Sequence, residues 1–172
     1  MKKTIKTISV LALFLVATIF AANAQYENGS SYLNVGVGFG GGLGLPIGVS
    51  YEKGITDNIS VGGYAGYASS SQDYGFGIKS SLTYIIVGAR GSYHFTNLGI
   101  DKLDPYVGAL LGYNIASSKV TGAPVGWTQP SVGGLAWGGH AGARYAFTDK
   151  FGGFAEVGYG IAYLTVGLSV KF

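Results

Sequence analysis

The sequence of 172 residues contains no cysteine, four prolines and few charged side chains, namely 11 Lys or Arg and eight Asp or Glu. The lack of cysteine excludes disulfides, thiol nucleophiles and thiolate metal sites. Charged residues make up 11% of the chain, against about 25% in an ordinary soluble domain, which argues against a plain globular enzyme. An apolar fraction of 48% excludes disorder. The chain is rich instead in glycine, with 31 residues, and in aromatic residues, with 13 Tyr and nine Phe.

The N-terminus has the layout of a cleaved secretory signal. Three lysines within the first six residues precede an apolar run, Val10–Ala22, which ends in the small-residue site Ala22-Asn23-Ala24. A membrane-spanning helix needs about 20 apolar residues, and this run is shorter. We therefore expect a signal peptide over 1–24 and one mature domain over 25–172. Removing the three lysines leaves eight basic and eight acidic residues, so charge gives no reason to expect a nucleic acid partner.

The mature chain alternates between apolar and small or polar residues and shows no helical period. This period of two is typical of strands that expose two different faces. The alternation occurs in eight runs, an even number, and most are close to the nine to eleven residues of a tilted membrane strand. The runs are Leu33–Phe39, Ile47–Glu52, Ile59–Tyr67, Tyr84–Phe95, Tyr106–Ile115, Leu135–Phe147, Glu156–Ile161 and Leu164–Phe172. The pattern predicts an all-β fold, an eight-stranded antiparallel up-and-down transmembrane β-barrel.

The connections between the runs differ at the two ends of this barrel. The segments 56–58 and 148–150 are short turns rich in Asp and Asn, and the connection 97–104 ends before a proline that can open a strand. At the other end we expect loops over 40–45, 69–80 and 117–134. Short turns at one end and mostly longer loops at the other are typical of outer membrane barrels.

The composition of the two faces indicates which one lies outside. A soluble lipocalin-like barrel would turn the apolar set inward and leave mostly Gly, Ser and Ala toward water, a poor soluble surface. The inverse arrangement places small residues in a narrow lumen and apolar residues against lipid. Aromatic residues also gather near both ends of the outward face, as expected of interfacial girdles. The expected girdle residues are Phe39, Tyr51, Tyr67, Tyr93, Tyr113, Trp137, Tyr145, Tyr159 and Phe172.

With its signal, its eight alternating runs, its girdles and the terminal run Leu164–Phe172, the sequence resembles the small eight-stranded outer membrane β-barrel proteins. This group includes outer membrane protein X and the transmembrane domain of outer membrane protein A. The resemblance implies a Gram-negative outer membrane location, in contact with membrane lipid and lipopolysaccharide. It also implies that the barrel assembly machinery reads the C-terminal strand Leu164–Phe172.

Four charged residues within the strand runs fall on the inward face: Glu52, Arg90, Arg144 and Glu156. The turn near 149 should place Arg144 opposite or diagonal to Glu156, and the earlier turns should place Glu52 level with Arg90. Because buried charges are costly unless paired, we expect an ion network that plugs the lumen. The alternative is a narrow ion or small-solute channel that this network gates.

No catalytic, cofactor or metal site is expected from the sequence. Glu52 and Glu156 lack an obvious substrate cleft, because an eight-stranded lumen is just wide enough for side chains. A lipid A-modifying enzyme is a less favoured alternative, since His94 and His140 both face inward and fit lumen hydrogen bonding. We therefore expect a non-enzymatic protein with a structural or surface-interaction role of the adhesion type, with an extracellular ligand at loops 69–80 and 117–134.

Overall fold

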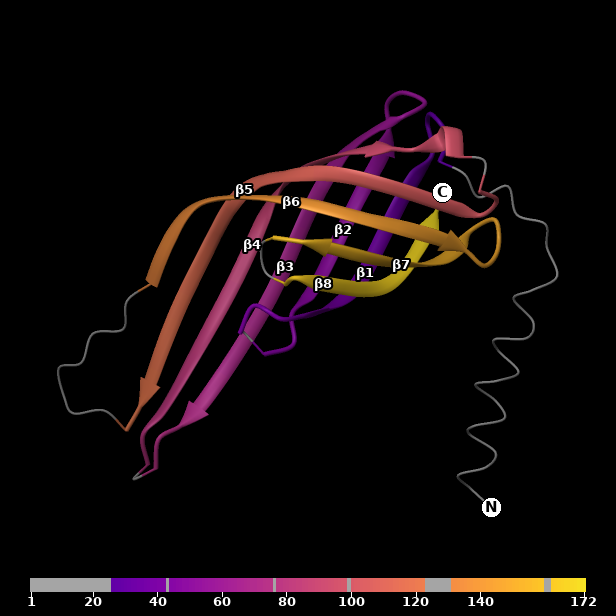
Figure 1. The fold of residues 1–172 in the computed structure, drawn as a ribbon. Helices are drawn as coiled ribbons and strands as arrows, with labels where there is room; N and C mark the ends of the chain where they lie inside the picture. Colours follow the sequence, from indigo (N-terminus) through magenta and orange to yellow (C-terminus); the bar gives the residue numbers. More distant parts are fainter. Residues whose placement is uncertain (1–25, 43, 76, 99, 123–130, 160–161) are drawn as a thin grey trace, which may run out of the picture.

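The computed structural model of the chain describes residues 26–42, 44–75, 77–98, 100–122, 131–159 and 162–172. These residues form eight strands in one closed barrel, in which β1 pairs with β8 (Figure 1). The elements are β1 (Ser31–Phe39), β2 (Ile47–Gly54), β3 (Ile59–Asp73), β4 (Lys79–His94), the 3-10 helix η1 (Thr96–Leu98), β5 (Leu103–Thr121), β6 (Ser131–Ala146), β7 (Phe151–Gly158) and β8 (Leu164–Lys171). Every neighbouring pair is antiparallel and follows the chain order. The predicted eight-stranded antiparallel up-and-down barrel is confirmed.

The strand register separates an apolar outer surface from a polar interior. Val35 on β1 lies between Val49 on β2 and Leu168 on β8, and all three side chains are exposed on the outside. The preceding residue, Asn34, points inward, where its amide donates to Ser50 Oγ at 2.9 Å. Because side chains alternate between the two sides of a strand, consecutive residues point in turn to the outer surface and to the lumen. The period of two in the sequence therefore corresponds to this alternation between the outer surface and the lumen.

Glycine makes room for aromatic rings inside this narrow barrel. The ring of Phe154 on β7 occupies the lumen next to Gly36 on β1 and Gly167 on β8. A Cβ atom on Gly36 would stand 2.8 Å from both Phe154 Cζ and the Val166 carbonyl oxygen, and one on Gly167 would stand 2.7 Å from Phe154 Cε1. Bare backbone at both positions thus lets a large side chain fill the space that two Cβ atoms would otherwise occupy.

We expect Gly36→Ala to lower the free energy of unfolding by about 1–3 kcal/mol, because the new methyl group overpacks Phe154 and a strand carbonyl. The measurement is urea unfolding of the refolded barrel in detergent micelles. Gly63→Ala is the matched control, since its Cβ would meet nothing closer than 3.8 Å. Equal unfolding midpoints for the two variants would contradict this account of the interior.

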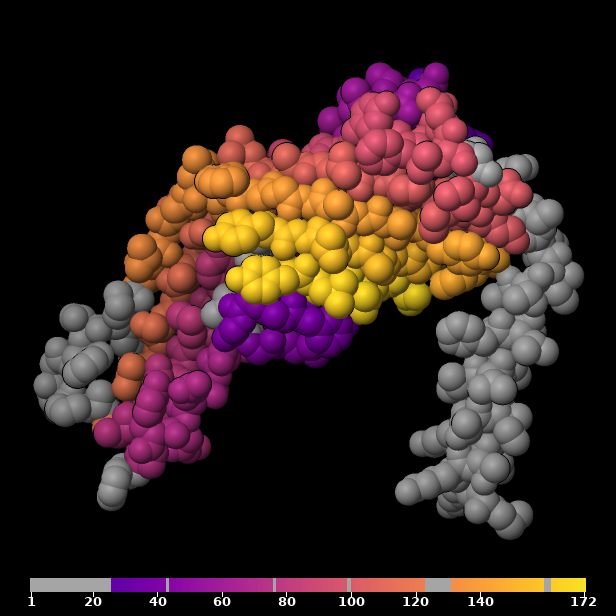
Figure 2. Space-filling model, viewed as in Figure 1, coloured from indigo at the N-terminus to yellow at the C-terminus, as the bar shows by residue number. Residues whose placement is uncertain are grey.

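Four strands are longer than the sequence pattern predicts. β3, β4, β5 and β6 have 15, 16, 19 and 16 residues, whereas the other four have eight or nine. The predicted loop 69–80 is instead mostly strand, joined by a tight turn, and both ends of the predicted loop 117–134 are strand as well. Residues 123–130 of that loop lie outside the described residues. The extended strands project beyond the short half of the barrel (Figures 1 and 2).

The turns at the opposite end match the sequence prediction. Thr56 Oγ1 accepts hydrogen bonds from the backbone N–H groups of Asn58 and Ile59. Thr148 Oγ1 does the same for Lys150 and Phe151. In both turns a threonine hydroxyl takes the place of a backbone acceptor, which is why such short segments reverse the chain. The predicted signal peptide 1–24 lies outside the described residues, and no helix in the described ranges is long and apolar enough to span a membrane.

Candidate functional site

Six titratable side chains from five strands meet inside the barrel, and we call them the lumen network. Five of them belong to residues with at most 6% of their surface exposed. The six residues of the lumen network are Glu52 on β2, Arg90 and His94 on β4, Asp104 on β5, Arg144 on β6 and, less buried than the others, Glu156 on β7. Each stands at an inward position of its strand, so closure of the barrel brings residues from distant parts of the chain together.

Glu52 is the centre of the lumen network. One of its oxygens, Oε1, lies 3.2 Å from Arg90 Nε and 2.7 Å from Arg144 Nη2. The other, Oε2, accepts hydrogen bonds from Ser60 Oγ at 2.9 Å and Ser92 Oγ at 2.8 Å. A fully buried carboxylate needs such partners, because its loss of hydration is otherwise uncompensated. The structure thus places Glu52 and Arg90 at one level, as the register argument expects.

Arg144 has different partners from the one that the sequence predicts. Its Nη1 lies 3.0 Å from Asp104 Oδ2, and its guanidinium lies 4.6 Å from the ring centroids of both Tyr32 and Tyr106. The predicted partner, Glu156, pairs instead with Arg90 at 2.8 Å. The register does place Glu156 diagonal to Arg144, since Glu156 pairs with Gly142 and Arg144 with Phe154. Their ion pairs are nevertheless made with other residues, because the Arg144 side chain crosses the lumen toward Glu52.

His94 lies in a Ser–His–Asp arrangement with completely buried surroundings. Its Nδ1 is 2.7 Å from Asp104 Oδ1, and its Nε2 is 2.9 Å from Ser60 Oγ. These are the distances of a hydrolytic triad. However, Ser60 and His94 are both 0% exposed, and the Ser60 hydroxyl donates to Glu52. The arrangement can hold protons and charge in fixed positions, but it gives a substrate no route to the hydroxyl.

All nine residues predicted for the girdles are exposed at outward positions of the barrel. Phe39 ends β1 and Tyr159 directly follows β7, at the end with the extended strands, whereas Tyr93 and Tyr145 lie near the ends of β4 and β6 at the end with the short turns. Their exposed fractions range from 45% for Phe39 to 71% for Phe172. The nine are Phe39, Tyr51, Tyr67, Tyr93, Tyr113, Trp137, Tyr145, Tyr159 and Phe172.

Solved structures that resemble this barrel include three bacterial outer membrane β-barrels. The N-terminal β-barrel domain of Pseudomonas aeruginosa OprF superimposes with a TM-score of 0.58 at 21% identity, over 86% of this chain and 100% of that one. The chain has the fold of the small outer membrane β-barrels. Ail, the attachment invasion locus protein of Yersinia pestis, gives a TM-score of 0.55 at 16% identity, over 84% and 99% of the two chains. Neisserial surface protein A gives 0.56 at 19% identity, over 83% and 94%. No family model and no curated protein sequence matches the chain.

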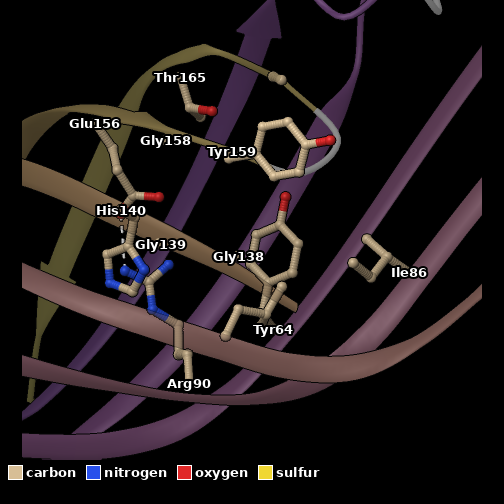
Figure 3. A pocket seen from close by; sticks show the side chains of 12 residues that line it. Tyr64, Ile86, Arg90, Gly138, Gly139, His140, Glu156, Gly158, Tyr159 and Thr165 are labelled. Atoms are coloured by element: carbon tan, nitrogen blue, oxygen red, sulfur yellow. Dashed lines mark hydrogen bonds and ion pairs between the residues drawn. The ribbon is translucent and has the colours of Figure 1, made fainter. Parts of the chain in front are cut away.

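Beside the lumen network, this outer membrane barrel fold has a partly open cavity of about 40 Å³. Arg90, His140, Glu156 and two tyrosines, Tyr64 and Tyr159, line it (Figure 3). Such a volume holds three or four water molecules at about 10–15 Å³ each and is too small for an organic substrate. His140 Nε2 lies 3.0 Å from Ser92 Oγ, which ties His140 to the lumen network. No group of three potential metal ligands of the His, Cys, Asp and Glu types occurs in the described part of the chain.

Asp104 is a member of the lumen network that the sequence did not predict. The proline at 105 indicated a connection up to Asp104, but β5 begins at Leu103 and includes both residues. The signal was present in the alternation, because Asp104 stands two positions before the inward-facing Tyr106. Ser60 and Ser92 also stand at inward positions, and the sequence predicted no role for either of them. In the outer membrane barrel fold, small hydroxyl side chains leave room for long arginines and supply the missing donors.

Proposed function

We propose that the protein is a non-enzymatic integral outer membrane barrel with a structural or surface-interaction role and a lumen plugged by the lumen network. The apolar outer surface is the observation that carries this proposal. Large hydrophobic side chains are exposed on every strand, among them Val35, Val49, Val87 and Leu168, while the polar residues turn inward. In water this arrangement would be costly, whereas in lipid the closed barrel satisfies its backbone hydrogen bonds and buries its apolar surface.

The geometry of the lumen network supports a closed lumen. Arg90 and Arg144 extend from β4 and β6 to the same carboxylate on β2, so their ion pairs cross the interior instead of lining it. Tyr32 and Tyr106 pack against the Arg144 guanidinium. Together these side chains fill the section of an eight-stranded barrel, whose interior is just wide enough for them.

The extended strands support a surface-interaction role. They present a sheet rich in Ser and Thr beyond the girdle, ending in a hairpin where Lys79 Nζ lies 3.3 Å from Asp73 Oδ2. We propose that an extracellular ligand binds this region, at residues 69–80 and 117–134. We also propose membrane lipid and lipopolysaccharide as partners of the outer surface. The barrel assembly machinery is the proposed partner of the terminal strand 164–172, and a signal peptide over 1–24 would direct the export.

The alternative is a narrow ion or small-solute channel. One observation favours it: Arg90 and Arg144 share a single oxygen of Glu52, so the departure of one guanidinium leaves the other pair intact. Re-pairing within the lumen network could then open a path without breaking every contact. A lipid A-modifying enzyme has no such support, because the Ser60–His94 pair lies in the buried lumen and not on the lipid-facing surface.

Planar-bilayer recording of the refolded mature protein separates the plug from the channel. We expect no stable conductance from the wild type, because the ion pairs cross the lumen and fill it. Spontaneous openings whose frequency changes in Glu52→Ala would overturn the plugged lumen and support the channel. Lys79→Ala is the control, because it removes an exposed ion pair outside the barrel. An altered lipid A acyl pattern in mass spectra of cells that express the protein would contradict the non-enzymatic role.

A further inference from the structure

The residues before β1 form a cap over the short-turn end of the lumen. This cap, Tyr26–Ser30, is tied to the end of β2 by two backbone hydrogen bonds, from Gly29 N to Gly54 O at 3.1 Å and from Gly54 N to Ser30 O at 2.9 Å. On the other side, Lys171 Nζ at the end of β8 lies 3.2 Å from Glu27 Oε2. The chain is thus anchored on both strands that flank β1.

Tyr26 is the part of the cap that enters the barrel. Its side chain is buried, and the single proton of its hydroxyl is shared between two carbonyl oxygens, of Thr56 in the turn after β2 and of Ile59 at the start of β3. Burial raises the pKa of Tyr26 to about 12, so the hydroxyl keeps the proton that it donates. The Tyr26 ring lies parallel to the His94 ring, with a centroid distance of 3.8 Å and an interplanar angle of 6°. Tyr26 therefore covers one face of the His94 ring at the short-turn end of the lumen network.

Both ring nitrogens of His94 lie next to oxygen atoms that can only accept a hydrogen bond from them. Asp104 Oδ1, 2.7 Å from Nδ1, belongs to a carboxylate that also binds Arg144. Ser60 Oγ lies 2.9 Å from Nε2 and equally 2.9 Å from Glu52 Oε2. Since Glu52 can only accept and a hydroxyl has one proton, Ser60 donates to Glu52 and must accept from His94.

The charges of the lumen network lead to the same result. Two guanidinium groups, of Arg90 and Arg144, face three carboxylates, of Glu52, Asp104 and Glu156, so one positive charge is missing. A buried cluster with an uncompensated charge is strongly disfavoured. His94 is the remaining titratable member of the network, and the groups packed around it are Tyr26, Ser60 on β3, and Asp104 and Tyr106 on β5.

We propose that His94 is an imidazolium cation that completes the charge balance of the lumen network, and that Tyr26 is a cap held on this cation by stacking. The parallel contact at 3.8 Å then joins an aromatic face to a desolvated cation, which strengthens it beyond an ordinary ring stack. The proposal deepens the plugged lumen of the proposed function and rests on it. In this proposal the segment Tyr26–Ser30 closes the short-turn end of the lumen. The strand pairs of β1 with β2 and β8 begin after this segment and do not depend on it.

Nitrogen NMR of the refolded protein, labelled with ¹⁵N-histidine, tests the cation directly. His94 should show two protonated ring nitrogens at neutral pH. His140 is the internal comparison: Ser92 donates to Glu52 and so accepts from His140 Nε2, which a neutral ring satisfies. The chain has two histidines, so a His140→Gln variant assigns both sets of signals. A neutral His94 spectrum would overturn the proposal, whether or not the lumen conducts.

Variants at position 26 test the cap. Tyr26→Phe keeps the stacked ring and loses the hydroxyl, whereas Tyr26→Ala loses both. We expect deuterium exchange at the His94 ring carbon, followed by mass spectrometry, to become about tenfold faster or more in Tyr26→Ala and to stay near the wild-type rate in Tyr26→Phe. Wild-type rates in both variants would overturn the cap. Unchanged heat-modifiable gel mobility shows that each variant has folded, and bilayer recording reports separately on the plugged lumen.

Discussion

Replacement of Arg144 by methionine is expected to lower the free energy of unfolding of the refolded barrel by about 3–5 kcal/mol. The guanidinium binds Glu52 at 2.7 Å and Asp104 at 3.0 Å, and its Nε donates to Asn34 Oδ1 at 3.2 Å. Methionine fills much of the same volume but leaves two buried carboxylates short of a counter-charge. The loss of stability therefore comes mainly from the buried carboxylates that lack a counter-charge, and less from the missing ion pairs themselves. Urea unfolding in detergent micelles, followed by tryptophan fluorescence, measures it.

Two further variants make this result specific. Lys79→Met removes one partner of an ion pair in which both side chains are more than half exposed, and it should change stability little, because water screens such pairs. Arg144→Lys keeps the charge but cannot hold two carboxylates with a rigid fork, so it should fall between wild type and methionine. If Arg144→Met unfolded at the same urea concentration as Lys79→Met, the lumen network would not stabilise the barrel.

Arginine in place of Leu168 should destabilise the barrel by about 2–4 kcal/mol, because the new charge would lie near the middle of the lipid-facing surface. Leu168 is 66% exposed and lies halfway along β8, between Leu164 and the girdle residue Phe172. Refolding yield into lipid vesicles and the heat-modifiable shift on gels both report the loss. The expected effect depends on the bilayer, since arginine on a water-exposed surface is well tolerated.

Val132→Arg is the matched control for this prediction. Val132 is 63% exposed, also branched and aliphatic, and lies on β6 beyond the girdle residue Trp137, in the extension that should stand in water. It matches Leu168 in exposure but not in face, since it stands on the face of β6 that continues the lumen wall. We expect its substitution to leave refolding unchanged. Equal tolerance of arginine at both positions would contradict a membrane-embedded outer surface and favour a barrel that is soluble in water.

The alternation of the sequence predicts the barrel because lipid and lumen demand opposite side chains on every strand within the membrane. The alternation predicts the strand ends poorly where this demand no longer holds. In the extension, residues on both faces of β3 are exposed or partly exposed, so the run Ser69–Ser71 lacks the period of two although the backbone stays paired. The alternation of apolar and polar residues therefore indicates the part of a strand that crosses the membrane, and not the full length of the strand. For this reason the sequence pattern could not locate the strand ends in the extension.

The sequence predicts four of the charged residues in the lumen but not the ion pairs that they form. Inward parity is sufficient to place Glu52, Arg90, Arg144 and Glu156 in the interior, because it depends only on counting along each strand. Which carboxylate meets which guanidinium depends on strand tilt and on the reach of a long side chain, as the Arg144 pairs show. Tyr26 was beyond any periodic argument, since it precedes the first strand and enters the barrel by a local turn of the chain.

In the proposed outer membrane location, the length of the extension determines how far the hairpin between β3 and β4 stands from the lipid. Beyond Tyr67, β3 continues for six residues to Asp73, or about 20 Å of strand at 3.3 Å per residue. With a tilt of about 45° this is a height of about 14 Å, more than the 5–8 Å of a headgroup layer. In that location, paired strands instead of a flexible loop would hold the hairpin tip in water beyond the headgroups. A ligand captured there would not have to immobilise a floppy loop, so less conformational entropy would be lost on contact.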